Sequence, residues 1–234
     1  MDLAELRQRL DALAASLQED QQEVLRARLR SLSSVFPFSE YEYILMFLLE
    51  NEALTFSQYE TLRSEYLSAN RFLDVYGLAP RIFGQVWAEQ HLRDLDPRFE
   101  KASRELDPSY DGEYDLWLSG LRIEVKASRA INSKKRGNLV EKALRWGSQE
   151  PFWMNFQQLK PDACDYFVFV GVWVDRIVYW ALSTGEARSN PYFSHQHRGG
   201  IEYQIGITHQ NIESFERLRV ESGDLVARIV QETQ

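Results

Sequence analysis

The chain has 234 residues, 44% of them hydrophobic and 13% aromatic, which is enough for one domain with an appendage or two small domains. Its single cysteine, Cys164, excludes an intrachain disulfide and a cysteine-based zinc cluster. The net charge is −8, and the sequence contains neither a run of 18 apolar residues nor a signal-peptide pattern. We therefore expect a cytoplasmic protein without a membrane span.

The first 75 residues predict an all-helical N-terminal subdomain. Leucines recur at alternating three- and four-residue steps from Leu3 to Leu17, which is a heptad seam, and helix is expected over residues 1–32. This arm either associates with a second copy as a coiled coil or docks on the chain's own body. Pro37 ends the pattern, and further helices are expected from Ser39 to Glu50 and from Thr55 to about Leu73.

A second domain, expected over residues 76–234, begins with a helix from Arg81 to about Leu92. Its apolar residues Ile82, Val86 and Trp87 are expected to pack inward. This helix leads into the stretch that carries the chemistry.

Residues 110–129 predict a β-hairpin. Leu118 and Leu121 bracket a two-residue connection, Ser119-Gly120, of the length and composition that hairpins use. Pairing these leucines places Leu116 opposite Ile123, and the register of the remaining residues follows from that.

The same register places Asp115 opposite Glu124. Directly opposed residues have Cβ atoms roughly 4.5–5.5 Å apart, where like charges are destabilising. A divalent cation between the carboxylates would offset the repulsion. Side chains alternate along a strand, so Glu124 and Lys126 share one face, and two carboxylates and a lysine converge.

Alternating charge on a strand is also typical of a solvated outer face. The opposed aspartate and the charges nearby favour a functional site instead. Between Glu89 and Asp115, nine acidic residues stand against four basic ones, whereas between Arg122 and Arg145 eight basic residues stand against two acidic ones. An acidic stretch followed by a basic one suits a site that holds both a cation and a polyanion.

These residues resemble the restriction-endonuclease-like, PD-(D/E)XK nuclease superfamily. Asp115 matches the first acid of the motif, and Glu124-Val125-Lys126 matches its (D/E)XK triplet. Tyr114 stands where the family has proline, a departure that is frequent there. Asp111 is a rival for the first acid, although it lies in a glycine-containing turn outside the hairpin register.

The resemblance implies a nuclease that uses Mg²⁺. Asp115 and Glu124 would bind the metal together with the main-chain carbonyl of Val125. Lys126 would position the attacking water. Glu89, on the helix before the hairpin, would supply an additional acid.

The later elements complete an α/β pattern. A basic loop follows at 130–138, then a helix near Leu139–Trp146, a strand buried on both faces at 165–174 and a partner strand at 176–182. A polar loop is expected at 184–200, a last strand at 203–207, and closing helices from 211 and from 225. This order predicts a three-layer α/β core, a central mixed β-sheet flanked by helices, plus the N-terminal helical subdomain.

Basic and amide side chains after the hairpin are expected to contact DNA, because phosphates attract Lys and Arg while Gln and Arg read base edges. These residues are Arg129, Lys134, Lys135, Arg136, Lys160, Gln196 and Arg198.

The sequence therefore predicts a Mg²⁺-dependent endonuclease of the type II restriction kind, acting on double-stranded DNA as a homodimer. Such an enzyme implies a cognate DNA methyltransferase encoded separately. Three alternatives remain: a repair or nicking nuclease of the same superfamily, a catalytically inactive nucleic-acid-binding protein with this fold, and an interaction protein built on the helical arm.

Overall fold

The computed structural model describes residues 3–31, 37–195 and 202–231, and the chain is mixed α/β. It forms two compact units. Unit 1 comprises Met1–Gly77, Lys135–Gly147 and Trp173–Asp175, and unit 2 comprises Leu78–Lys134, Ser148–Val172 and Arg176–Gln234. None of the helices in these described ranges combines the length and the apolar character that crossing a membrane requires.

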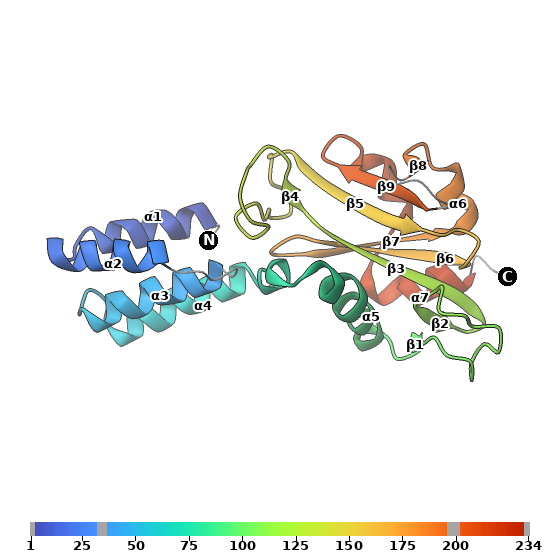
Figure 1. Ribbon diagram of the computed structural model, residues 1–234, viewed down its shortest axis with the longest axis horizontal. Helices are drawn as coiled ribbons and strands as arrows, with labels where there is room; N and C mark the ends of the chain where they lie inside the picture. Colours follow the sequence, from blue (N-terminus) through green and yellow to red (C-terminus); the bar gives the residue numbers. More distant parts are fainter. Residues whose placement is uncertain (1–2, 32–36, 196–201, 232–234) are drawn as a thin grey trace. The chain divides into compact units, whose positions relative to one another are not determined.

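Unit 1 is built on a set of packed helices (Figure 1): α1 (Leu3–Ala14), α2 (Glu19–Ser31), α3 (Pro37–Glu50) and α4 (Phe56–Ala69). The single helix predicted over residues 1–32 is wrong, because the chain turns between α1 and α2. Side chains satisfy the helix ends there: Ser16 Oγ donates to the Leu13 carbonyl, and Gln21 Oε1 accepts from the Gln18 N–H. Both helices contact α3, and Leu10 and Leu17 of the heptad seam are buried within this unit.

α4 begins at a capping box formed by Thr55 and Gln58. It ends at Ala69 rather than near Leu73, because the Asn70 amide donates to the Tyr66 carbonyl and terminates the helix. A short 3₁₀ helix, η1 (Asp74–Gly77), follows.

The helix predicted near Leu139–Trp146 is also wrong. These residues form turns that are held by contacts with residues 173–175. The Val174 N–H donates to the Leu144 carbonyl, and the Trp146 N–H donates to the Asp175 carboxylate at 2.8 Å. Trp146 also packs edge-on against Trp173, with ring centroids 4.6 Å apart. These long-range contacts override the local helical pattern.

Unit 2 is built around a six-stranded mixed sheet, sheet A, with the order β1-β2-β3-β6-β7-β10. Its strands are β1 (Glu100–Lys101), β2 (Leu116–Leu118), β3 (Leu121–Arg129), β6 (Tyr166–Val172), β7 (Ile177–Ser183) and β10 (Arg219–Val220). β3 and β6 are parallel and the other neighbours are antiparallel. Every residue of β6 is buried, and β7 is its antiparallel partner, as the sequence predicts.

A four-stranded sheet, sheet B, was not predicted. It has the order β4-β5-β9-β8, formed by β4 (Ile131–Asn132), β5 (Phe152–Leu159), β9 (Tyr203–Thr208) and β8 (Phe193–His195). It packs on one face of sheet A, where Phe156 stacks on Phe169 with centroids 4.3 Å apart and meets Trp180 edge-on. β8, together with the helix α6 (Thr184–Ser189), occupies much of the stretch predicted to be a loop at 184–200.

Helices cover the other face of sheet A, opposite sheet B (Figure 1). Besides α6, unit 2 contains the π-helix η2 (Ile82–Trp87), the helices α5 (Ala88–Leu95) and α7 (Leu225–Gln231), and the 3₁₀ helices η3 (Ile212–Leu218) and η4 (Ser222–Asp224). η2 and α5 contact β3, and α7 contacts β7. The predicted three-layer α/β core with a central mixed sheet is confirmed, with sheet B as part of one flanking layer.

An aromatic column fixes α5 to sheet A. Phe83, Trp87 and His91 stack in succession at four-residue steps, and His91 stacks on Tyr179 of β7 and lies 2.6 Å from its hydroxyl. The inward packing predicted for Ile82 and Val86 is wrong: both are exposed, because the buried side of η2 is the side of this column.

Candidate active site

The hairpin adopts the predicted register. Leu118 pairs with Leu121, Trp117 with Arg122 and Leu116 with Ile123. Ser119 and Gly120 both have positive φ, as a two-residue type I′ connection requires. This tight turn places Asp115, one residue before β2, beside Glu124 of β3.

Main-chain hydrogen bonds hold Asp115 in that position. Its N–H donates to the Ile123 carbonyl at 3.0 Å, and its Oδ2 accepts from the Val125 N–H at 2.8 Å. The aspartate is therefore fixed at both its backbone and its carboxylate, which directs the carboxylate toward the Glu124-Val125-Lys126 triplet.

Glu124 and Lys126 share a face of β3, and their side chains are in contact. Nζ of Lys126 lies 2.5 Å from Oε1 of Glu124. The Glu124 side chain is 8% exposed and that of Lys126 is 20% exposed. The alternative of a solvated outer face does not describe Glu124, because its side chain is almost fully buried.

Burial makes both carboxylates of this pair harder to ionise. Burial and the charge of Asp115 together raise the pKa of Glu124 to about 7, although the charge of Lys126 opposes the rise. Burial likewise raises the pKa of Asp115, although the hydrogen bond from Val125 acts against the rise. A cation bound between the two acids would favour the ionised form of both.

Glu89 lies on α5 within electrostatic reach of this pair. Burial, followed by the charge of Asp115, raises the pKa of Glu89 to about 7. The structure thus brings Asp115, Glu124 and Lys126 together, and Glu89 on α5 is near enough for its charge to interact with those of Asp115 and Lys126.

The pair opens into a groove of about 510 Å³, which we call the catalytic groove because three of the predicted catalytic residues line it. Asp115, Glu124, Val125 and Lys126 line it from the hairpin. Asp111 does not line it and is exposed, so the structure favours Asp115 over Asp111 as the first acid. Sequence reasoning did not assign the remaining polar lining residues, apart from Lys160, to the site: Arg81, Gln85, Glu113, Asn155, Gln157, Gln158 and Glu202.

Two of these missed residues reach the groove through a β-bulge. The pairing of β5 with β9 shifts between Phe156 and Leu159, and Gln158 takes the left-handed region at φ 58°. An extra residue in a strand re-aims its side chains and is common beside active sites. Because of the bulge, the consecutive residues Gln157 and Gln158 both line the same groove. The alternation of apolar and polar residues from Phe152 to Gln157 was the sequence signal for this strand.

The donor set fits magnesium. Within residues 3–31, 37–195 and 202–231, no three His, Cys, Asp or Glu side chains converge into a metal site. Asp115 and Glu124 offer carboxylate oxygens, and Val125 offers a main-chain carbonyl. Mg²⁺ is characteristically held by one or two carboxylates, with water and substrate phosphates completing its shell. A site with only oxygen ligands disfavours zinc and other softer metals.

The residues predicted to contact DNA differ in their placement. Arg129 does not face the catalytic groove: it is 7% exposed, donates to the Leu78 carbonyl at 2.7 Å and lies over the Phe83 ring. Its predicted DNA contact is therefore replaced by a structural role, anchoring η2 to β3. Lys134, Lys135 and Arg136 are exposed, the first in unit 2 and the other two in unit 1. Gln196 and Arg198 lie outside the described residues.

Lys160 lines the catalytic groove, as a phosphate-binding residue should. Its ammonium lies 2.6 Å from the Glu113 carboxylate, which lines the same groove. The hydrogen bond that Lys160 donates to Glu113 raises the pKa of Lys160, so its charge is firmly retained. This exposed ion pair is weak enough to be exchanged for a phosphate.

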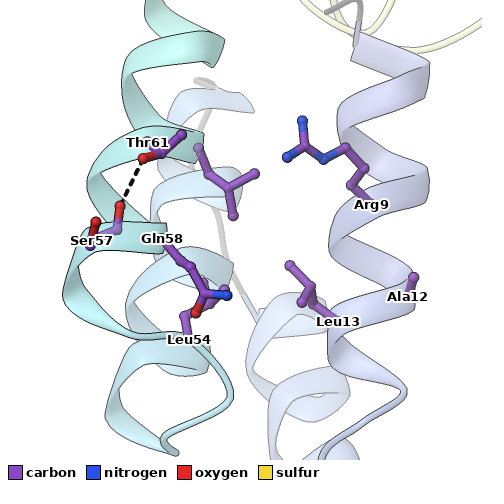
Figure 2. A pocket seen from close by; sticks show the side chains of 8 residues that line it. Arg9, Ala12, Leu13, Leu54, Ser57, Gln58 and Thr61 are labelled. Carbon is purple, nitrogen blue, oxygen red and sulfur yellow. Dashed lines mark hydrogen bonds between the residues drawn. The ribbon is translucent and has the colours of Figure 1, made fainter.

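A second hollow, of about 400 Å³, lies between α1 and α4 in unit 1 (Figure 2). Leu13, Leu54 and Leu62 line it with a few hydroxyl and amide groups, and Arg9 at its side forms an ion pair with Glu65. None of its described lining residues is acidic, so it lacks the paired carboxylates of the catalytic groove.

No protein-family model matches the chain, and no curated protein is similar enough to it to count as a relative. Function must therefore be inferred from the chemistry of the site itself.

Proposed function

We propose that this protein is a Mg²⁺-dependent endonuclease that hydrolyses phosphodiester bonds in DNA. The observation that carries the proposal is the contact between Glu124 and Lys126 beside the anchored carboxylate of Asp115, at the floor of a groove. Two acids and a lysine in this arrangement match what phosphodiester hydrolysis needs: an anionic cation site and a positive charge next to it.

Asp115, Glu124 and the Val125 carbonyl would hold the magnesium ion. When bound, the ion would act as a Lewis acid toward the phosphate and lower the pKa of water. Its charge would also favour ionisation of the two carboxylates, whose pKa values burial raises.

Lys126 is placed to bind the scissile phosphate or its attacking water. Its ammonium is mostly buried against Glu124, so it is pre-oriented rather than mobile. A positive charge in a partly desolvated site stabilises the developing charge of the transition state more strongly than it would in water. Glu89, near Asp115, would orient this cluster or accept a proton.

Lys160 and the exposed bases at 134–136 would bind the substrate backbone. We further propose double-stranded DNA as the substrate, a type II restriction enzyme as the kind of nuclease, and a homodimer as the active form, since cutting both strands requires two sites or two events. A separately encoded methyltransferase would then protect the host DNA.

The direct test is incubation of the purified protein with supercoiled plasmid and phage DNA, with Mg²⁺ or with EDTA, followed by sequencing of the fragment ends. Mg²⁺-dependent linear fragments with a shared end sequence are the expected result. Nicked circles alone would indicate the repair or nicking alternative. Salt-sensitive binding without any cleavage would indicate an inactive DNA-binding protein.

A further inference from the structure

Unit 2 has another groove besides the catalytic groove. It has a volume of about 550 Å³ and lies on the outer face of sheet B, and we call it the sheet-B groove. None of its described lining residues is charged: they are Trp153, Asn155, Pro191, Tyr192, Ser194, Gln204, Gly206, Thr208, Gln210 and Asn211. Its volume falls within the roughly 300–1,000 Å³ of small-ligand sites, which combine apolar surface with a few placed polar groups. The function proposed above makes no use of it.

Strand alternation builds this face. Phe152, Met154 and Phe156 of β5 point inward and are buried, so Trp153 and Asn155 between them point outward. Trp153 pairs with Thr208 and Asn155 pairs with Gly206 on β9. The outer face of sheet B therefore presents an aromatic ring and an amide side by side.

The aromatic surface of the groove is open to a ligand. Trp153 is 46% exposed and Tyr192 is 38% exposed. Gly206 leaves the space beside the indole free: even a Cβ at this position would come no closer than 3.7 Å to Nε1 of Trp153. The Tyr192 ring is held by stacking on Phe215, with centroids 5.7 Å apart. A flat ring can therefore enter beside a pre-positioned indole.

An amide pair supplies hydrogen-bonding groups in the same groove. Nδ2 of Asn155 donates to Oε1 of Gln204 at 3.1 Å. Among the described residues, Oδ1 of Asn155 and Nε2 of Gln204 make no hydrogen bond, so the pair presents one acceptor and one donor. Adenine offers the complementary set, its N6 amino donor and N7 acceptor.

The sheet-B groove and the catalytic groove meet at Asn155, which lines both. The Asn155 N–H also donates to Oγ of Ser128 at 3.1 Å. Ser128 lies two residues after Lys126 on the same face of β3, a separation of roughly 7 Å along a strand. A nucleotide whose phosphate lies at Lys126 would have its neighbour at the mouth of the sheet-B groove.

We infer that the sheet-B groove receives an unpaired nucleobase of the nucleic acid whose backbone is cleaved at the catalytic groove; the inference rests on the proposed function. A base inside a duplex is stacked on both faces, so an aromatic side chain stacks on it only when the base is extruded or single-stranded. A concave groove admits such a base, whereas reading a paired base requires side chains that protrude into a DNA groove. Trp153 would stack on the base and the amide pair would bind its edge.

Binding can be measured by fluorescence anisotropy in EDTA, which prevents Mg²⁺-dependent cleavage. Three labelled duplexes of equal length are compared: one fully paired, one with a central unpaired adenine, and one with an abasic residue in place of that adenine. The abasic duplex keeps the backbone and removes only the base. We expect the wild-type protein to bind the unpaired-adenine duplex about 5- to 100-fold more tightly than the abasic one.

Two substitutions test the groove independently. Trp153→Ala removes the stacking surface, and Gly206→Leu fills the space beside it while leaving Trp153 in place; each should abolish the preference for the base. Trp153→Phe keeps an aromatic face and should keep most of the preference. Phe56→Ala, which removes an exposed aromatic residue of α4 in unit 1, is the matched control and should change nothing.

If both Trp153→Ala and Gly206→Leu keep the preference for the unpaired adenine, the inference is overturned. The proposed function would still stand in that case, provided that the protein cleaves plasmid in Mg²⁺. Equal binding of the adenine and abasic duplexes by the wild-type protein also overturns it. Absence of binding to all three duplexes overturns it too, and absence of plasmid cleavage in addition would remove the proposed function. A final control is maltohexaose: Trp153-dependent binding of this neutral sugar, with no base preference, would assign the groove to carbohydrate instead.

Discussion

The carboxylate of Asp115 accepts a 2.8 Å hydrogen bond from the main-chain N–H of Val125, the middle residue of the Glu-Val-Lys triplet. Asp115 directly precedes strand β2, and the backbone of strand β3 orients its carboxylate. The geometry of the cluster depends on backbone pairing, which a change of side chain at one position can leave intact. A conservative substitution can therefore test the chemistry of one side chain without disturbing the backbone of the hairpin.

Asp115→Asn should lower the rate of Mg²⁺-dependent cleavage by about 100-fold or more, because a charged metal ligand is lost. The amide oxygen of the new side chain can still accept the hydrogen bond from the Val125 N–H. Folding and DNA binding should be retained. Plasmid cleavage and thermal melting measure the two effects. Asp111→Asn is the matched control, because Asp111 is exposed and outside the catalytic groove; if it, and not Asp115→Asn, removes activity, the assignment of the first acid is wrong.

Lys126→Met should lower the rate of cleavage by roughly 10²–10³-fold, the cost of losing one preorganised charge at the transition state. DNA affinity should change little, because this lysine is mostly buried against Glu124. Single-turnover rates and anisotropy separate the two quantities. Lys142→Met removes the same charge at a residue of unit 1 that does not line the catalytic groove; a comparable loss of rate in that variant would contradict a specific role for Lys126.

Stability of the metal-free protein should fall as pH rises from about 4.5 to 7. The folded-state pKa of Glu124 is raised to about 7, so the folded state binds more protons than the unfolded state across this window, and raising the pH favours unfolding. The loss is on the order of 3 kcal/mol for a carboxyl group shifted this far. Glu124→Gln should remove the contribution of Glu124 to this slope in urea unfolding measured at a series of pH values, and Glu89, whose pKa is also raised to about 7, should supply part of the slope that remains.

Magnesium should reverse the same effect. Because the ion binds the ionised carboxylates, it should raise the melting temperature at pH 8 and have little effect at pH 5, where protons compete for the pair. Thermal melts with Mg²⁺ or EDTA at both pH values provide the measurement. A shift of equal size in Asp115→Asn/Glu124→Gln would place the ion elsewhere.

Replacing Lys134, Lys135 and Arg136 together by alanine should weaken DNA binding and reduce the slope of log affinity against log salt by up to about 2.7, or about 0.9 per lost phosphate contact. The matched control replaces Arg26, Arg28 and Arg30, which removes the same number of charges from α2. An unchanged slope in the first variant would show that the basic loop is merely solvated surface.

Gly171→Ala should destabilise the fold by about 1–3 kcal/mol, through overpacking between the two sheets. A Cβ at Gly171 would lie 2.6 Å from the Trp180 ring and 3.2 Å from the Met154 sulfur. Gly185→Ala, inside α6 with no atom near its added Cβ, should be neutral or stabilising. Urea unfolding of both variants tests the close approach of sheet A to sheet B.

Much of the catalytic cluster follows from local sequence. The Ser119-Gly120 connection determined the hairpin register, and the register brought Asp115 to Glu124. The uninterrupted apolar run at 166–172 likewise identified the central strand. In each case neighbouring residues specify the structure, so no distant contact was needed to predict it.

What the sequence left out depends on contacts between distant segments. Leu139–Trp146 has the apolar spacing of a helix, but its backbone bonds to residues 173–175 instead. Gln157 and Gln158 enter the site only because a bulge forms when β5 pairs with β9, some 45 residues away in the chain. Arg129 sits in a basic stretch, yet the Phe83 ring and the Leu78 carbonyl hold it inside unit 2.

The division of the chain into units has a practical consequence for protein engineering. The backbone passes between them five times, after Gly77, Lys134, Gly147, Val172 and Asp175. A truncated protein starting at Leu78 would retain segments 135–147 and 173–175 but lack the helices of unit 1 with which these segments fold. The helical part is therefore not a detachable module, and grafting it onto another protein, or deleting it, would require redesigning the exit from the central strand.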